Sequence, residues 1–373
     1  MTRSASSAPA FTLESGDYVP APPSDREGYG IAIVGCGQVV RDAHAPAYRK
    51  AGYRVAACFD IEPKRAETVA DMLPGCRVAA SLTDLLETPD IQIVDLALHP
   101  QHRIGVLQRI AALPPARRPR AVLSQKPFAR SIEEATQMIA LCADAGILLA
   151  INQQMRYCPA PAAIRRLIAR GDLGHVYAVT HLKRGDQDQP GTWWAQMPDF
   201  LLRDYAVHFL DLTRCFTMRE PARVQAVTGR RPGQVAVAPL LYSIVLEYAP
   251  DAKVVSTLHF NDLIPTDPAT ACEEWWVDGT EGSVLATPQQ LTFVSRAAPR
   301  HRHVVDLQGG WYPDAFIGSM GEVMRALTEN RPPEISADDN LNTLRLSLAA
   351  LESSRTGEGV FLPAPVRGKT TAI

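Results

Sequence analysis

The sequence has few cysteines, and none of them forms a pair that could build a zinc site or a disulfide framework. Its seven cysteines occur singly, and no two stand in a Cys-x-x-Cys motif. A secreted disulfide scaffold would need an even, closely spaced set. We therefore expect most of these residues to be small buried apolar side chains of a protein in a reducing compartment, and the cytoplasm is the predicted location.

Long apolar runs are also absent. Stretches such as Ile31–Val34 and Ile147–Ile151 are far shorter than the roughly 20 residues that span a bilayer. The N-terminal stretch contains neither a continuous apolar segment of secretory length nor a twin arginine. We expect no transmembrane helix and no membrane partner.

Charge of one sign is not in excess either. The chain has 38 basic and 40 acidic side chains and a formal net charge of -2. Surfaces that bind nucleic acid normally show clustered lysine and arginine, so nucleic acid is not an expected partner. The length of the chain is informative as well. Its 373 residues exceed the roughly 250–300 at which a single hydrophobic core stops growing, so we expect more than one domain.

Composition and hydrophobic pattern divide the chain into three segments. Residues 1–28 are rich in Ser, Ala and Pro and lack periodicity, which predicts a flexible Pro-rich arm. Residues 29–151 alternate apolar strands with helical stretches, which predicts an α/β domain with a parallel sheet covered on both faces. Residues 152–373 combine helices with alternating strands joined by short turns. This pattern predicts an α+β domain with a large, mostly antiparallel open sheet.

A Gly-Cys-Gly turn at residues 35–37 lies between the first predicted strand and the first predicted helix. Only glycine lets the backbone turn tightly there and approach a pyrophosphate. Val40 occupies the third position of the GxGxxG pattern, so the glycines alone are a weak match. The next predicted strand ends in Asp60, whose carboxylate would bind the ribose hydroxyls and repel a 2′-phosphate. These residues predict a Rossmann domain that binds NAD, against the simpler alternative of a structural turn. A nearby arginine such as Arg65 would admit NADP.

A predicted helix from about residue 200 to residue 216 carries an unusual polar ladder. Asp204, His208 and Asp211 are spaced i, i+4 and i+7, so they would share one helix face. Solvated helix faces normally carry Lys, Glu or Arg instead. We expect Asp204 to orient His208 and raise its basicity, so that His208 takes a proton from a hydroxyl, while Asp211 serves the fold. The alternatives are a hydrogen-bonded structural histidine and a zinc site, although the sequence offers no convincing third zinc ligand, and we expect no metal.

Ser-Gln-Lys-Pro at residues 124–127 follows another predicted strand and resembles the Glu-Lys-Pro signature of the Gfo/Idh/MocA oxidoreductases, the glucose-fructose oxidoreductase and inositol dehydrogenase group. The resemblance extends from residue 30 to residue 362. It also includes the blocks at residues 44–47, 152–157, 171–174, 204–211 and 279–282. No single block is decisive, but their order and spacing together are specific.

The resemblance implies a Rossmann domain followed by an open-sheet domain, NAD(P) as cofactor, and oxidation of a secondary alcohol of a sugar, polyol or cyclitol in the cleft between them. It also implies homodimers or homotetramers that pack through the second-domain sheets. Gln125 replaces the family's glutamate, so its contact with the nicotinamide ribose would be a neutral hydrogen bond. The catalytic residues would be Lys126, Asp204 and His208. The cofactor-binding residues would be Gly35, Cys36, Gly37, Gln38, Val39, Asp60, Gln125 and Lys126. The substrate-binding residues would be Lys126, Arg156, Tyr157, Trp193, Trp194 and His208.

Several of these residues have a simpler interpretation. Arg156 would then form a salt bridge, and His44 would be a packing residue of the first helix. Trp193 and Trp194 would cover the apolar face of a sugar, or else belong to the core or a subunit interface. For the second tryptophan pair, at residues 275–276, core or interface is the preferred interpretation.

Two other functions remain open from the sequence. In the first, the enzyme keeps its cofactor bound between two half-reactions or uses it in redox-assisted glycoside processing. The Pro-rich arm motivates this alternative, because such an arm can wrap a neighbouring subunit. The second is a non-catalytic sugar or nucleotide sensor, against which the retention of Lys126, Asp204 and His208 argues.

Overall fold

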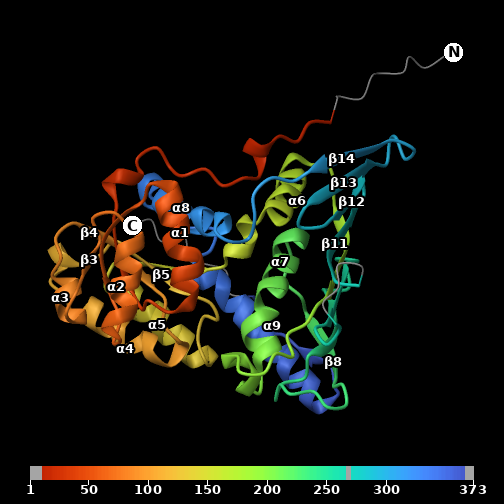
Figure 1. The fold of residues 1–373 in the computed structure, drawn as a ribbon. Coiled ribbons are helices and arrows are strands. Elements are labelled where there is room, and N and C mark those ends of the chain that lie inside the picture. The colour runs from red at the N-terminus through yellow and green to blue at the C-terminus, as the bar shows by residue number, and fades with distance from the viewer. Residues whose placement is uncertain (1–10, 266–269, 366–373) are drawn as a thin grey trace.

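Two β-sheets, one of six strands and one of nine, organise the computed structural model of the protein, which describes residues 11–265 and 270–365 (Figure 1). The six-stranded sheet forms the first domain, and the nine-stranded sheet stands beside it in the second. Helices fill the space between the two sheets.

The first sheet is entirely parallel, with the strand order β3-β2-β1-β4-β5-β6. This is the doubly wound order of a Rossmann fold, in which ligands bind where the order reverses, here between β1 and β4. Strands β1 and β5 are buried along their whole length because helices cover both faces. The strands are β1 (Gly30–Val34), β2 (Arg54–Phe59), β3 (Arg77–Val78), β4 (Ile91–Leu96), β5 (Ala121–Gln125) and β6 (Leu148–Asn152). The helices are α1 (Ala45–Ala51), α2 (Pro63–Met72), α3 (Leu82–Leu86), α4 (Pro100–Ala111) and α5 (Ile132–Asp144). The predicted parallel α/β domain is confirmed.

The second sheet has the order β14-β13-β12-β11-β7-β10-β9-β8-β15, and its one parallel pair among the described strands is β7 with β10. Its strands alternate between a buried and an outward face, as in β9, where Tyr242, Ile244 and Leu246 are buried. The strands are β7 (Val176–Arg184), β8 (Arg223–Gly229), β9 (Leu241–Glu247), β10 (Val255–Asn261), β11 (Cys272–Gly279), β12 (Gly282–Ala286), β13 (Gln290–Ser295), β14 (Arg302–Asp306) and β15 (Val360–Phe361). The mostly antiparallel open sheet is therefore confirmed as well.

Helices α6 (Pro159–Arg170), α7 (Val207–Thr217) and α9 (Ala337–Thr356) lie on the face of this sheet that looks toward the first domain (Figure 1). The opposite face carries no helix in the part of the chain that the structure describes (Figure 1). Short turns of 3₁₀-helix occur at Ser15–Asp17, Arg26–Gly28, Pro115–Arg117, Gln154–Tyr157 and Trp193–Gln196. Two turns of π-helix occur at Val40–His44 and Leu201–Tyr205.

Helix α8 (Asp314–Glu329) shows that the chain after residue 152 is not confined to the second domain. All its residues from Asp314 to Met324 are buried, as expected for a helix held between two layers. Its Ile317 carbonyl accepts a hydrogen bond from the Tyr53 hydroxyl, 2.9 Å long. The segment after α8 also contacts the first domain, since the Ile335 carbonyl accepts a hydrogen bond from the N–H of Ile151 in the edge strand β6. The predicted division at residues 151 and 152 therefore stays a prediction, because α8 packs against β5 of the first sheet, and α9 packs against strands of both sheets.

The N-terminal segment does not behave as the predicted flexible arm over its described part, residues 11–28. It runs across the top of the molecule (Figure 1) and buries Leu13 and Tyr18. The Phe11 ring stacks on Phe293 at 4.8 Å, and Asp17 pairs with Arg166 at 3.0 Å. The prediction failed because an extended segment needs only scattered apolar anchors on a surface built by distant residues, and such anchors show no period. Residues 1–10 lie outside the described residues.

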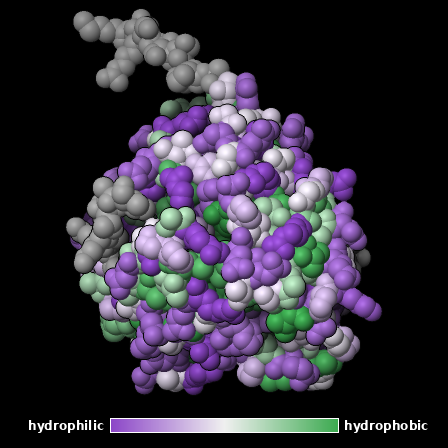
Figure 2. Space-filling view, turned by 90° about the vertical axis from the view of Figure 1, so that its left-hand side faces the viewer, coloured by the Kyte–Doolittle hydropathy of each residue, from purple (hydrophilic) through white to green (hydrophobic). Residues whose placement is uncertain are grey.

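On the face shown in Figure 2, hydrophilic residues predominate and hydrophobic ones form smaller groups between them. No helix within the described ranges is long and apolar enough to cross a membrane. All seven cysteines are free thiols, as the isolated spacing predicts.

Candidate active site

The Gly-Cys-Gly turn directly follows β1, and its two glycines have different reasons to be glycine. Gly35 has a φ of +93°, and a Cβ on it would lie 2.6 Å from the Ala97 carbonyl oxygen, so no larger residue fits. A Cβ on Gly37 would meet nothing within 4 Å, so its backbone is open on that side. Cys36 is buried, and its Sγ lies 3.8 Å from the Phe59 carbonyl oxygen at the end of β2. The open backbone and the helical residues Gln38 and Val39 that follow suit a pyrophosphate group.

Asp60 is fixed in place by the same turn. Its Oδ2 accepts the Cys36 N–H at 2.7 Å, and its Oδ1 accepts the Glu62 N–H at 2.9 Å. Each carboxylate oxygen keeps a free lone pair, so the two together can accept a pair of ribose hydroxyls. Arg65 is exposed on the first turn of α2. The residues present therefore fit a dinucleotide.

Lys126 follows β5 and meets a residue of the second domain. Its Nζ donates to Asp204 Oδ2 at 2.7 Å and to the Asp204 carbonyl oxygen at 2.8 Å. These two side chains are 16% and 14% exposed, so the ion pair is mostly shielded from water but still reachable. The buried Arg103 holds the backbone behind Lys126, since its guanidinium donates to the carbonyls of Leu98 and Phe128.

The predicted alignment of Asp204 with His208 is wrong. Asp204 lies in the π-helical turn Leu201–Tyr205, and α7 begins only at Val207. A π-turn holds more residues than an α-turn, so positions i and i+4 no longer lie above one another. Asp204 therefore points to Lys126, and no hydrogen bond between Asp204 and His208 occurs among the described residues.

His208 instead lies against two glutamines that follow β6. Its Nδ1 is 3.2 Å from Gln153 Oε1, and its Nε2 is 3.5 Å from Gln154 Nε2. An amide oxygen can only accept, so Nδ1 carries the proton and Nε2 presents a lone pair. Burial and the positive charge of Lys126 hold the pKa of His208 well below its usual value. His208 is thus neutral at pH 7, and the expectation of raised basicity is wrong.

Arg156 and Tyr157 lie in the interior. The Arg156 guanidinium makes two hydrogen bonds to Asp211, at 2.6 and 2.7 Å, and one to Asp339 at 2.6 Å. Tyr157 packs against Gly318 of α8, where an added Cβ would lie 2.5 Å from its ring. Burial raises the pKa of Tyr157 above its ordinary value. The salt-bridge alternative for Arg156 and the structural role of Asp211 are confirmed, and substrate binding by Arg156 and Tyr157 stays a prediction.

The tryptophans divide between surface and core. Trp193 is 51% exposed, and its ring lies edge-on to His99, 6.1 Å away, just beyond the end of β4. Trp194 stacks on Phe200 and is packed. Trp275 is a core residue of the second sheet, and Trp276 lies on its open face. Of the two candidates for covering a substrate, Trp193 alone stands at the strand ends of the first domain.

Gln125 is the residue for which the resemblance implies a contact with the nicotinamide ribose. Its side chain is 6% exposed, and both ends of its amide are engaged inside the protein. Its Nε2 lies 3.0 Å from His44 Nε2, and its Oε1 accepts the Lys126 N–H at 2.8 Å. The predicted hydrogen bond from Gln125 to the nicotinamide ribose stays a prediction, but the main contacts of this carboxamide are with His44 and the Lys126 backbone.

Sequence reasoning missed Gln153, Gln154 and Trp311. The two glutamines follow the last parallel strand, whose end lies at the same sheet edge as Lys126, and that position was the available signal. The Trp311 ring lies edge-on to His208 at 5.7 Å. It comes from a loop about a hundred residues further along the chain, and only the tertiary fold reveals it.

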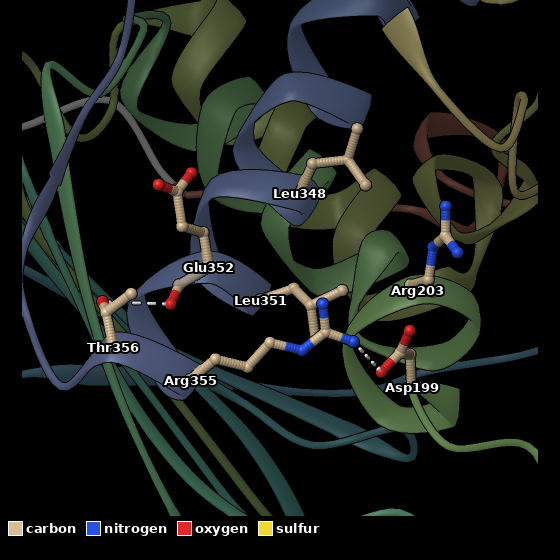
Figure 3. A pocket seen from close by; sticks show the side chains of 7 residues that line it. All are labelled: Asp199, Arg203, Leu348, Leu351, Glu352, Arg355 and Thr356. Atoms are coloured by element: carbon tan, nitrogen blue, oxygen red, sulfur yellow. Dashed lines mark hydrogen bonds and ion pairs between the residues drawn. The ribbon is translucent and has the colours of Figure 1, made fainter.

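A surface hollow of about 300 Å³ lies beside this region but is not the reaction site. Figure 3 shows Arg355 of α9 reaching across it to Asp199, with which it pairs at 2.7 Å. Arg203 also lines it, one residue before Asp204, but Lys126 and His208 do not. No group of three or more His, Cys, Asp or Glu side chains suited to a metal ion occurs in the described ranges.

The fold and the nucleotide turn define a two-domain oxidoreductase that uses a nicotinamide dinucleotide. Residues 29–153 match the family described as oxidoreductases with an NAD-binding Rossmann fold, GFO_IDH_MocA, and residues 162–285 match the C-terminal domain of the same family. The chain belongs to the GFO/IDH/MocA oxidoreductase family.

Relatives resemble the chain over most of its length. A D-apiose dehydrogenase of Paraburkholderia graminis is 26% identical over 89% of this chain and 89% of its own. An inositol 2-dehydrogenase of Acidothermus cellulolyticus is 27% identical over 88% of this chain and 94% of its own. An oxidoreductase of Agrobacterium radiobacter, solved with NAD+, L-tartaric acid and magnesium, shares the fold with a TM-score of 0.75 at 23% identity, covering 90% of this chain and 98% of that one.

Proposed function

We propose that the protein is an NAD-dependent dehydrogenase or reductase that interconverts a secondary alcohol and a ketone of a neutral sugar, polyol or cyclitol. The observation that supports it most is that the Lys126 ammonium follows β5, while the neutral His208 lies against the two glutamines that follow the neighbouring strand β6. The names of the apiose and inositol dehydrogenases among its relatives support this substrate class.

Lys126 and His208 have complementary roles in this proposal. NAD, when bound, supplies the hydride acceptor. Lys126 Nζ holds the substrate oxygen and stabilises the negative charge that develops on it, while Asp204 fixes the direction of the ammonium. His208 Nε2 takes the hydroxyl proton, because Gln153 holds the proton on Nδ1 and the substrate hydroxyl displaces the long, 3.5 Å contact from Gln154 Nε2.

The polar atoms around His208 favour a neutral substrate rich in hydroxyl groups. Gln153 Nε2, Gln154 Oε1 and Trp311 Nε1 are buried and have no hydrogen-bond partner among the described residues. Unpaired donors and acceptors cost free energy until a ligand pairs with them. Amide and indole groups suit hydroxyls, which both donate and accept, better than they suit a carboxylate or phosphate.

Neither alternative function gains support. Cofactor retention was motivated by an arm that wraps a neighbouring subunit, but residues 11–28 pack on their own chain. A purely sensory role would not require the Lys126–Asp204 pair beside a neutral histidine. The oxidoreductase remains the function that the geometry supports best.

The first test is a screen of neutral sugars, polyols and cyclitols with NAD, followed by absorbance of reduced nicotinamide. On a substrate found this way, Lys126→Met and His208→Gln should each lower kcat by roughly 10²–10⁴-fold, because each removes a group that handles the reacting oxygen or its proton. NAD binding, measured by calorimetry, should change little. His175→Gln, at an exposed histidine outside the site, is the matched control.

The pH dependence follows from the lowered pKa of His208. Oxidation should keep its rate below pH 6.5 and fall only when His208 becomes protonated at lower pH. A kcat near the wild-type value in both Lys126→Met and His208→Gln would contradict the proposed mechanism.

A second prediction concerns cofactor choice. Asp60→Ala should raise the KM for NAD by about tenfold or more, because hydrogen bonds from the ribose hydroxyls to a charged acceptor are lost. It should also relieve the repulsion of the NADP phosphate, so the preference for NAD over NADP should narrow. Glu62→Gln, next to the same turn, is the control and should leave both values unchanged. A wild-type enzyme that prefers NADP would contradict the assignment.

We also infer that a second copy of the chain covers the open face of the nine-stranded sheet. One row of uncharged residues crosses this face. Each residue of the row is paired with the next one on the neighbouring strand, and none of them is buried. The row consists of Val304, Thr292, Leu285, Trp276, Thr180, Thr257, Val245 and Gln225. An uncharged, partly apolar sheet face of this extent is typical of a protein–protein interface.

Sedimentation velocity tests this inference directly. The wild-type protein should sediment as a dimer or tetramer, and Trp276→Arg combined with Val245→Lys should shift it toward the single chain. Ile61→Lys, at an equally apolar and 84% exposed position in the first domain, should not. A wild-type protein that sediments as one chain at micromolar concentration would contradict the inference.

A further inference from the structure

A chain of buried hydrogen bonds connects Lys126 to an aspartate inside the first domain. His44, at the end of the π-helical turn Val40–His44, is completely buried between α1, β4 and β5. Its Nδ1 lies 2.6 Å from Asp95 Oδ2, and its Nε2 lies 3.0 Å from Gln125 Nε2. Tyr48 adds a hydrogen bond of 2.7 Å from its hydroxyl to the same Asp95 oxygen.

The atoms determine which way every proton in this chain points. An amide nitrogen can only donate, so Gln125 Nε2 donates to His44 Nε2, and that nitrogen carries no proton. The proton of neutral His44 is therefore on Nδ1 and is donated to Asp95. At the other end, Gln125 Oε1 accepts the N–H of Lys126 at 2.8 Å. All donors thus point in one direction, from Lys126 through Gln125 and His44 to Asp95.

This arrangement requires a neutral side chain at position 125 for as long as His44 is neutral. A glutamate there would present only acceptor atoms, so it would pair with His44 only if both ring nitrogens were protonated. Asp95, His44 and residue 125 would carry the same net charge either way, with one negative charge in all. Gln125 therefore makes a neutral hydrogen bond to His44 where a glutamate would make a buried ion pair.

The groups that face His44 do not change this protonation. Asp95 comes from β4, and Tyr48 from α1. Burial and the neighbouring Asp95 hold the pKa of Tyr48 well above its usual value, so its hydroxyl stays protonated. Helix α8 contributes the apolar ring of Phe316, 4.8 Å from the imidazole.

We propose that Asp95, His44 and Gln125 are positioning residues that fix the backbone of Lys126 and thereby aim its ammonium at the reacting oxygen. The proposal rests on the proposed function, because it assumes that Lys126 acts on the substrate. None of the three residues needs to touch the substrate. Their effect passes through the Lys126 N–H, where a displacement of about 1 Å can cost on the order of 10²-fold in rate.

Gln125→Met tests the proposal, because methionine has nearly the shape of glutamine but makes neither hydrogen bond. We expect kcat to fall roughly 10- to 100-fold, with little change in the KM for NAD. Tyr48→Phe is the matched control, since it removes one bond to Asp95 but leaves the chain from Lys126 to His44 intact, and its kcat should stay within about twofold of wild type. Circular dichroism and thermal melting report whether each variant is folded.

Gln125→Glu tests the proposal through the pH dependence of activity, which should not change if these residues only stabilise the fold. The activity of this variant should fall as the pH is raised, because its carboxylate can pair with His44 only while both ring nitrogens carry protons. The wild-type enzyme should lack this alkaline limb. NMR of ¹⁵N-histidine-labelled protein, assigned with His44→Gln, should show one protonated ring nitrogen for His44 in the wild type and two in Gln125→Glu.

Two outcomes would overturn the proposal: a wild-type His44 protonated on both nitrogens, or a folded Gln125→Met with wild-type kcat. Lys126→Met, measured in parallel, shows whether a negative result contradicts the positioning role of Gln125 or the proposed function itself. If Lys126→Met is inactive and Gln125→Met is normal, the positioning chain fails while the proposed function stands. If Lys126→Met is fully active, the proposed function itself fails.

Discussion

The ion pair between Lys126 and Asp204 is the interaction on which the proposed site depends. It joins the end of β5 in the first domain to the π-helical turn before α7 in the second, with an N–O distance of 2.7 Å. Without it, the lysine ammonium would lose the charged partner that fixes its direction. The positive charge held there is also one of the two causes that keep His208 neutral.

Much of the fold followed from the sequence, because alternation of apolar strands and helices determines a parallel sheet. The same reasoning located Gly35, Asp60 and Lys126, since each follows a strand and the carboxyl ends of parallel strands meet at one edge. The side-chain directions beyond those strands were less predictable. Residue spacing assumes an α-helix, and the π-turn before α7 directs Asp204 toward Lys126 while His208 lies against two glutamines.

The remaining features that the sequence did not reveal have a common physical cause. Arg156 pairs with Asp211 and Asp339, and Trp311 reaches His208 from a distant loop, so their surroundings exist only after the domains have packed. The N-terminal segment binds to a surface formed by residues far along the chain and needs no periodic pattern of its own. Gln125 was assigned to the cofactor from the resemblance, and nothing in the sequence indicated its contact with His44, which is 81 residues earlier.

A double-mutant cycle on the Lys126–Asp204 pair tests the central claim most directly. The kcat of Lys126→Met, Asp204→Asn and the double variant should be measured with the same substrate at saturating NAD. If the pair acts as one unit, the double variant should be hardly slower than Lys126→Met alone, because Asp204 acts only by aiming the ammonium. Losses that add, each residue lowering kcat by the same factor whether or not the other is present, would contradict the account.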